Sequence, residues 1–195
     1  MAYCKKPLIL ASGSPRRREL LDKFGISYEI LPAQGEESAP ADLSPGERVK
    51  VLAAQKAAEV ADRVRDPAAV ILAADTLVEL DGIVLGKPGT PEKAREMLRA
   101  LSGRSHRVWS GVCICEGDRT VCESECTTVH FRALSDAEID AYTATGEPLD
   151  KAGAYGYQGL ASLFVERIEG DFFNVMGLPV CRMGQMLREF GISLL

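Results

Sequence analysis

Hydrophobic and polar positions along this chain follow two different periods, which together predict both strands and helices. The runs at residues 8–11 and 70–74 are short and almost entirely apolar, which is typical of buried strands. Residues 91–101 instead place apolar side chains three or four positions apart, as one face of a helix does. Because helical and strand-like segments alternate along the sequence, we expect an α/β fold.

Residues that favour helix and hairpin boundaries divide the chain further. Helices are expected to begin at four N-cap residues, namely Ser14, Ser44, Thr90 and Ser135. Ser44 and Ser135 each precede a glutamate by three residues, which predicts a capping box at both. The dipeptide Asp81-Gly82 predicts a two-residue hairpin turn that pairs Leu80 with Ile83. The other expected elements are a longer hairpin over 107–133, strands at 28–31 and 163–168, and a last helix over 183–190.

The size and charge of the chain limit the kinds of protein it could be. Its 195 residues, 46% hydrophobic and 26% charged, suit a single domain, or two lobes that share one core, and no linker divides them. The net charge of -5 argues against a protein that binds nucleic acid or an anionic membrane. No apolar run approaches the roughly 18 residues of a membrane span, and the run at 8–11 is too short for a signal peptide, so we expect a cytoplasmic protein.

The segment after the first predicted strand has the features of an anion-binding turn. The chain passes through Ser12 and Gly13 into a predicted helix whose first turn carries Arg16, Arg17 and Arg18. Cations at a helix N-terminus oppose the helix dipole by roughly 0.3–1 kcal/mol each, and a bound anion would offset that cost. The alternative is that these arginines only face water. The glycine spacing and the Lys-Ser/Thr pair of a P-loop are both missing.

Two charged residues stand in or beside apolar segments. Lys56 falls on the apolar face of the predicted helix at 45–64, so its ammonium either extends to water or meets an anion. Asp75 directly follows the apolar run at 70–74, and ligand sites of open α/β sheets lie at the carboxyl ends of strands. Asp75 is therefore the first candidate for a carboxylate with a chemical role.

The predicted hairpin register brings a lysine to this carboxylate. Counting outward from the turn at 81–82 places Lys87 opposite Thr76 and therefore beside Asp75. A carboxylate, a hydroxyl and an ammonium group at one sheet edge could hold a metal-bound polyphosphate. The alternative is a structural ion pair between Asp75 and Lys87.

Three other signals are weaker. Glu36 and Glu37 lie in a polar loop and matter only if that loop folds over the site. The glycine-rich stretch at 153–159 could approach a ligand, with Gln158 reading a base edge, or could be a flexible loop.

Of the six cysteines, four lie in the long hairpin, but two of these are four strand residues apart, about 13 Å, which is too far for one zinc ion. We expect these cysteines to be small apolar side chains, and no disulfide framework.

Four motifs occur along the chain in this order: LASGSPRR at 10–17, ADT at 74–76, GKP at 86–88 and DKAGAYGYQG at 150–159. Together they resemble the Maf family of nucleotide pyrophosphatases, and the resemblance runs nearly end to end. It implies an elongated α/β fold related to inosine triphosphate pyrophosphatases, in which a mixed sheet with flanking helices leaves a cleft between two lobes. It also implies dependence on Mg²⁺ or Mn²⁺, and often a homodimer.

The resemblance assigns site residues position by position. Asp75 takes the place of the catalytic carboxylate, while Ser12 and Arg17 match the serine and arginine of the opening motif. The positions that match the family's other polar site residues are Glu37, Lys56 and Lys87. The resemblance therefore explains why a lysine, Lys56, stands on an apolar helix face.

The family has two main branches, one that favours dTTP, UTP and related modified pyrimidine nucleotides and one that favours 7-methyl-GTP. Arg16, Thr76 and Gln158 resemble the specificity set of the pyrimidine branch. Tyr157 stands where some relatives carry an aliphatic residue, a departure that touches only the fine substrate preference.

We therefore expect metal-assisted hydrolysis of a nucleoside triphosphate to the monophosphate and pyrophosphate, as house-cleaning of the nucleotide pool. Asp75 would bind the metal, activate water, or both, and Glu37 would be a second metal ligand. The groups expected to stabilise phosphate charge are Arg17, Lys56, Lys87 and the backbone donors from Ser12 to Ser14. Two rivals from other classes are a regulator of cell division that binds nucleotide without turnover, and a nucleic-acid-binding module.

Overall fold

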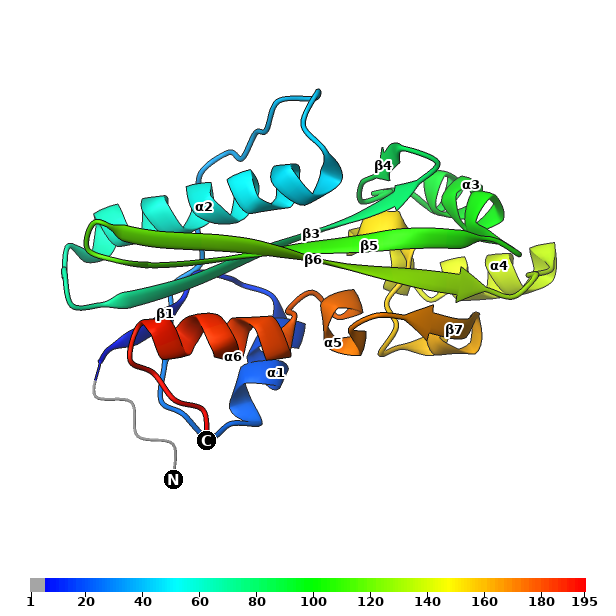
Figure 1. Cartoon of the computed structure of the whole chain (residues 1–195). Helices are drawn as coiled ribbons and strands as arrows, with labels where there is room; N and C mark the ends of the chain where they lie inside the picture. Colours follow the sequence, from blue (N-terminus) through cyan, green and yellow to red (C-terminus); the bar gives the residue numbers. More distant parts are fainter. Residues whose placement is uncertain (1–5) are drawn as a thin grey trace. The chain divides into compact units, whose positions relative to one another are not determined.

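A seven-stranded mixed sheet runs through this computed structural model, which describes residues 6–195 (Figure 1). Its strands are β1 (Leu8–Leu10), β2 (Glu29–Ile30), β3 (Val70–Leu80), β4 (Ile83–Leu85), β5 (Ser105–Glu116), β6 (Arg119–Phe131) and β7 (Val165–Glu169). Their order in the sheet is β2-β1-β3-β5-β6-β7, and β4 pairs with β3 outside this path. The expected α/β class, a mixed sheet with flanking helices, is confirmed.

The helices follow the predicted N-caps closely. They are α1 (Pro15–Asp22), α2 (Pro45–Val64), α3 (Pro91–Leu101), α4 (Asp136–Ala144), α5 (Phe172–Val175) and α6 (Val180–Glu189). Three 3-10 helices lie at Glu147–Asp150, Ala152–Ala154 and Leu160–Leu163. Helices α2 and α4 begin with capping boxes at Ser44 and Ser135, as the sequence predicts. Within residues 6–195, no helix has both the length and the apolar character needed to cross a membrane.

The chain divides into two compact units. Unit 1 contains the residues up to Asp75 together with Ser110–Glu125 and Gly177–Leu195, and unit 2 contains Thr76–Trp109 and Cys126–Met176.

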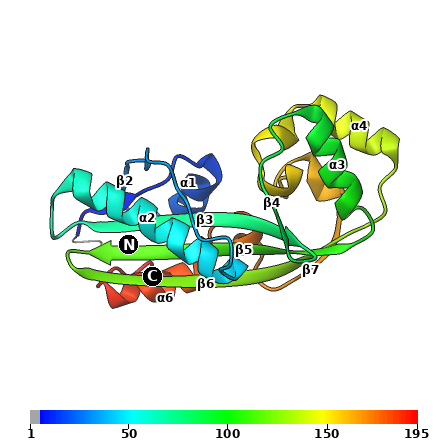
Figure 2. The same cartoon turned by 90° about the horizontal axis from the view of Figure 1, so that it is seen from above.

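In unit 1, strand β1 pairs in parallel with both β2 and β3, and Leu10 lies beside Leu72. Helix α2 covers one face of these strands, and α1 and α6 lie on the other (Figures 1 and 2). Close contact of α2 with β5 depends on Gly111, because a Cβ there would lie 2.3 Å from the backbone oxygen of Val49. The small residues Ala53 and Ala57 continue this close packing of the helix on the sheet.

The cysteines of unit 1 contribute to the same apolar layer. Cys113 and Cys115 are buried beneath α2, and Cys122 packs against them from a partly buried position. Among the described residues the remaining cysteines are also free thiols, whereas Cys4 lies outside the described part of the chain. The predicted role as small apolar side chains is therefore confirmed for Cys113 and Cys115.

Unit 2 has its own core, to which the rest of β3, the β4 hairpin, α3 and α4 all contribute. Leu80 pairs with Ile83, as the turn predicts. The largest side chains of this core include Leu98, Phe131, Tyr142 and Phe164. Helices α3 and α4 lie side by side (Figure 2) and are joined at their surface by two ion pairs, Arg95–Asp140 at 2.6 Å and Arg99–Asp136 at 2.8 Å.

Two expectations about strands are wrong. Strand β3 does not end before Asp75 but continues to Leu80, because it goes on pairing with neighbouring strands after β1 has left the sheet. The strand expected at 163–168 begins later, at Val165, since residues 160–163 form a 3-10 turn that buries Ala161. Tertiary pairing overrides the local apolar pattern in both places.

Candidate functional site

Lys56 joins two carboxylates in unit 1. Its Nζ lies 2.5 Å from Oδ1 of Asp75 and 2.9 Å from Oε2 of Glu37. The side chains of Lys56 and Asp75 are only 14% and 17% exposed, so water screens their interaction only in part. Lys56 therefore meets anions. The alternative, in which its ammonium only extends to water, is wrong.

Arg17 lies in the same part of unit 1. Its Nη1 donates a hydrogen bond to Oγ of Ser12 at 3.0 Å, and its Nε donates to the backbone oxygen of Gly177 at 2.8 Å. Burial lowers the pKa of Arg17 below its ordinary value, and the negative charges of Asp75 and Glu37 act in the opposite direction. Arg17 is thus a partly buried cation within electrostatic reach of both carboxylates, and does not simply face water.

The turn before α1 supplies further donors. The backbone N–H of Ser14 donates to Oγ of Ser12 at 3.3 Å, and Ser14 is the N-cap residue of α1, although its side chain makes no capping hydrogen bond. Arg16, partly buried, follows in the first turn, and its charge contributes to the lowered pKa of Arg17. A helix N-terminus with two adjacent guanidinium groups is suited to an anion with several oxygens.

The register of the parallel strands explains why Ser12 and Asp75 are neighbours. Leu10 lies beside Leu72, and the Ala11 N–H donates to the oxygen of Leu72 at 2.8 Å. Two residues further on, Ser12 reaches the level of Ala74, the residue before Asp75. Asp75 therefore lies at the carboxyl end of the parallel ladder, although not at the end of its own strand.

Side chains of α2 hold the loop that carries Glu37. Glu59 accepts hydrogen bonds from the backbone N–H groups of Gln34 and Gly35, with distances of 2.8 Å and 2.9 Å to its Oε2. Gln55 both donates to the Ser38 oxygen, at 2.7 Å, and accepts from the Ser38 N–H, at 3.2 Å. The sequence interpretation missed these two residues. Their spacing of four, which puts them on one helix face, is the signal that could have found them.

The remaining predicted site residues belong to unit 2. Strand β4 ends at Leu85, so the predicted pair of Thr76 with Lys87 is not part of the ladder. Pro88 lacks an N–H group and restricts the residue before it, which ends the strand at this point. Thr76 follows Asp75 directly in β3 and is partly buried.

Within unit 2 the segments that carry Lys87 and Gln158 are joined by their backbones. The Gly153 N–H donates to the oxygen of Gly86, and the Gly89 N–H donates to the oxygen of Leu149, each at 3.1 Å. Both side chains, Lys87 and Gln158, are exposed. The segment that carries Lys87 is thus joined to residues 149–153, which precede Gln158 in the chain.

The carboxylates of unit 1 suit a hard divalent cation in part. Within residues 6–195 no group of three or more His, Cys, Asp or Glu side chains could hold a metal ion. Glu37 and Asp75 nevertheless offer two carboxylates around one positive charge, that of Lys56. Mg²⁺ is usually bound by one or two carboxylates, water and the phosphates of a substrate, so the donor set fits a metal that arrives with a nucleotide.

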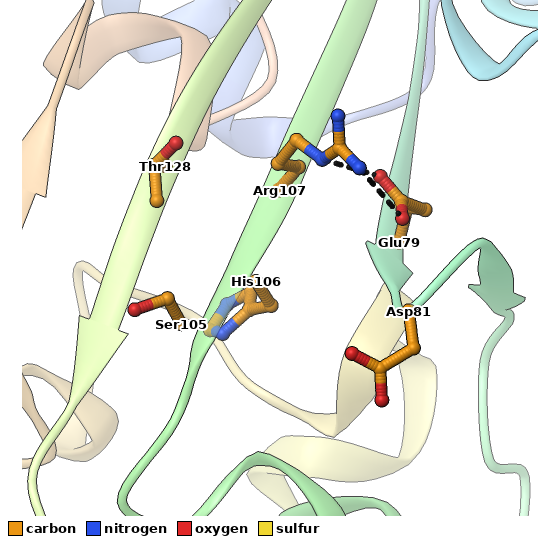
Figure 3. Close-up of a pocket in the computed structure, with 6 residues that line it drawn as sticks. All are labelled: Glu79, Asp81, Ser105, His106, Arg107 and Thr128. Carbon is orange, nitrogen blue, oxygen red and sulfur yellow. Dashed lines mark hydrogen bonds and ion pairs between the residues drawn. The ribbon is translucent and has the colours of Figure 1, made fainter.

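A separate hollow of about 230 Å³ lies in unit 2, lined by Glu79, Asp81, Ser105, His106, Arg107 and Thr128 (Figure 3). None of the predicted site residues lines it. Glu79 is 2% exposed, accepts from the Gly82 N–H at 2.6 Å and pairs with Arg107 at 2.8 Å. Burial lowers the pKa of His106 to about 4, so this ring is neutral near pH 7, and it packs edge-on against Phe131. Glu79 is paired with Arg107, and Nε2 of His106 shares a hydrogen bond with the Tyr155 hydroxyl at 2.7 Å, so both side chains are part of the packing of unit 2.

Comparison with known proteins gives consistent matches over nearly the whole chain. A family model described as Maf-like protein matches residues 7–190. A dTTP/UTP pyrophosphatase of Caldicellulosiruptor bescii is 48% identical over 194 residues, which is 97% of this chain and 98% of the relative. A dTTP/UTP pyrophosphatase of Bacillus anthracis is 47% identical over 188 residues, which is 96% of this chain and 97% of the relative. Among solved structures, the Ham1 protein of Staphylococcus aureus matches 65% of this chain and 72% of its own, with 14% identity and a TM-score of 0.46.

Proposed function

The chain belongs to the Maf family, and from this premise we propose that it hydrolyses dTTP and UTP to the nucleoside monophosphate and pyrophosphate. The observation that carries the proposal is the position of Lys56. An ammonium group held between Glu37 and Asp75, close to Arg17 at a helix N-terminus, combines the carboxylates and the cations that phosphoryl transfer from a triphosphate needs.

In this reaction water attacks the α-phosphorus, the bond between the α-phosphorus and the bridging oxygen breaks, and pyrophosphate leaves. Lys56 contacts Oδ1 of Asp75, and the Asp75 carboxylate would accept a proton from the attacking water. Arg17, fixed by Ser12 and by the Gly177 oxygen, would stabilise charge on the phosphate oxygens. Ser14 and Arg16 would add donors from the first turn of α1.

A divalent cation, Mg²⁺ or Mn²⁺, is part of the proposal. Glu37 and Asp75 would hold it, and when bound it supplies a Lewis acid that draws charge from the phosphate oxygens. Lys56 would then exchange its carboxylate partners for a phosphate oxygen. The ammonium keeps the two carboxylates together until the substrate brings its own cation.

Substrate preference is assigned to three residues. Arg16, Thr76 and Gln158 would recognise the base and its neighbouring groups, and Lys87 would meet the phosphates. Uracil and thymine share one edge, with an N–H donor next to an oxygen acceptor, and the Gln158 amide has both complementary groups. A homodimer and a house-cleaning role are further proposals that rest on the family resemblance, and a cytoplasmic location is a further proposal that rests on the sequence.

Asp75→Asn tests the proposal directly. The amide keeps the size of the side chain but neither accepts a proton nor binds a divalent cation well, so UTP should still bind while pyrophosphate release falls by at least a thousandfold. Binding is measured by calorimetry with a non-hydrolysable UTP analogue, and turnover by pyrophosphate release with Mg²⁺ or Mn²⁺. Full turnover in this variant would defeat the assignment of Asp75. A wild-type protein that binds nucleotide but never releases many equivalents of pyrophosphate would instead be a regulator, the rival function.

A further inference from the structure

Glu147 lies at the centre of the loop that carries Gln158. Its Oε1 accepts a hydrogen bond from the Tyr142 hydroxyl at 3.0 Å, and its Oε2 accepts from the Leu160 N–H at 3.2 Å. The carboxylate thus ties the end of α4 to the residue two positions after Gln158. No part of the proposed chemistry uses this side chain.

The Glu147 carboxylate occupies the space that a side chain at position 159 would fill. A Cβ added to Gly159 would lie 2.1 Å from Oε1 of Glu147 and 2.5 Å from its Cδ. Gly159 has φ of -100°, which any residue can adopt, so the need for glycine here comes from Glu147 and not from the backbone conformation. Gly159 directly follows Gln158, so the carboxylate lies next to the backbone that carries this amide.

The partners of Glu147 are themselves fixed. Tyr142 is buried, its ring packs edge-on against Phe164 at 5.1 Å, and its hydroxyl also accepts from the Gly156 N–H at 3.4 Å. Burial, and then the charge of Glu147, raise the pKa of Tyr142 above its ordinary value, so the hydroxyl stays a donor across the physiological range. Lys151 adds a hydrogen bond to the backbone oxygen of Glu147 at 2.6 Å.

We propose that Glu147 is a positioning residue for base recognition, which fixes the backbone directly at Leu160, and at Gly156 through Tyr142, so that the Gln158 amide meets the edge of uracil or thymine. This inference rests on the proposed function and adds to it the device that fixes the specificity loop. Glu147 does not touch the nucleotide and acts only through Gln158. Its removal should therefore weaken discrimination between bases and leave the phosphate chemistry in place.

The test compares UTP with CTP, which differ only at the base edge that Gln158 would read. In Glu147→Gln one of the two acceptors becomes an N–H donor that faces another donor, and the loop loses a fixed contact. We expect kcat/KM for UTP to fall about tenfold, mainly through KM, and kcat/KM for CTP to change by less than about threefold. Glu166→Gln, the same change at an exposed residue of β7, is the matched control and should leave both values unchanged.

A double-mutant cycle with Gln158→Ala separates positioning from a merely structural role. If Glu147 acts through Gln158, Glu147→Gln should cause no further loss of UTP preference once the amide is gone. A second cycle uses Gly159→Ala. As a single variant it should impair UTP hydrolysis, and in a Glu147→Ala background, where the clash is relieved, it should do so much less. Circular dichroism of each variant verifies that it is folded.

The outcomes distinguish the two proposals. A wild-type protein that releases no pyrophosphate from UTP or dTTP overturns the proposed function itself. An active wild type whose UTP preference is unchanged in Glu147→Gln and Glu147→Ala overturns the positioning role. The positioning role is also overturned if Glu147→Gln lowers the UTP preference as much in the Gln158→Ala background as in the wild type, because the carboxylate would then act by another route.

Discussion

Lys56→Met isolates the role of the ammonium group that lies between two carboxylates. Methionine is close to lysine in length and is apolar, so it suits the apolar face of α2 on which Lys56 stands. What the variant removes is the positive charge, and Glu37 and Asp75 are left facing each other. Removal of one partner of a partly buried ion pair is usually destabilising, even where replacement of the whole pair is not.

The size of the effect follows from the distances. Both carboxylate oxygens contact one nitrogen, at 2.5 Å and 2.9 Å, so they are at most about 5.4 Å apart. Two unit charges at that separation repel by about 3 kcal/mol at an effective dielectric constant of about 20. Since the side chains of Glu37 and Asp75 are 30% and 17% exposed and can turn toward water, we expect about 1–3 kcal/mol of lost stability. For a chain of this length that lowers Tm by roughly 2–12 °C.

Thermal unfolding at pH 7 in the absence of divalent cations measures this effect. Lys50→Met, on the same helix and without an ion pair among the described residues, is the control and should shift Tm by little. In a background that carries Glu37→Gln and Asp75→Asn, Lys56→Met should cost much less, because no repulsion is left behind. An unchanged or higher Tm for Lys56→Met alone would refute the reasoning and show that the lysine contributes nothing to holding the carboxylates.

Three further predictions concern other parts of the molecule. Gly111→Ala places a Cβ 2.3 Å from the oxygen of Val49, so α2 must move away from β5, and urea unfolding should show a loss of about 2 kcal/mol or more. Glu59→Gln weakens the charge-assisted hydrogen bond to the Gln34 N–H and loosens the loop that carries Glu37; kcat for UTP should fall several-fold with little change in Tm. His106 has a folded-state pKa of about 4, below its unfolded value. The stability that comes from keeping this ring neutral is therefore complete above about pH 6.5, and up to about 3 kcal/mol of it is lost as the pH falls toward 4. In His106→Phe, Tm should depend less on pH over that range.

Local signals in the sequence predicted the boundaries of the helices well. Ser44 and Ser135 form the expected capping boxes, and the Asp81-Gly82 turn gives the expected pairing of Leu80 with Ile83. These features depend on a few neighbouring residues, so the sequence is enough to read them. The length of β3 was not predictable in this way, because the polar pair at 75–76 interrupts the apolar run while pairing with neighbouring strands continues.

The residues of the site were found by a mixture of local pattern and family resemblance, but their contacts were not. The oddity of Lys56 on an apolar helix face pointed to an anion, and the structure supplies two. No spacing in the sequence connects Arg17 with Gly177, since 160 positions separate them. Glu147 was missed because its partners, a tyrosine hydroxyl and a backbone N–H group, come together only when the end of α4 packs against the loop. Such contacts depend on tertiary packing and leave no periodic signal.

The arrangement around Lys56 also has a consequence for the binding of divalent cations. In the absence of nucleotide the ammonium occupies the carboxylate oxygens that the cation would need, so Mn²⁺ should bind weakly to the protein alone. A triphosphate offers Lys56 other oxygens and so releases Glu37 and Asp75; a non-hydrolysable UTP analogue should therefore raise the affinity for Mn²⁺ by at least tenfold. In Lys56→Met the carboxylates are free at the start, and Mn²⁺ should bind without the nucleotide and restore much of the lost Tm. Calorimetry and thermal unfolding measure both effects without reference to turnover. If Mn²⁺ binds the wild-type protein equally well with and without the analogue, the ammonium and the metal do not compete, and the exchange of partners by Lys56 is wrong.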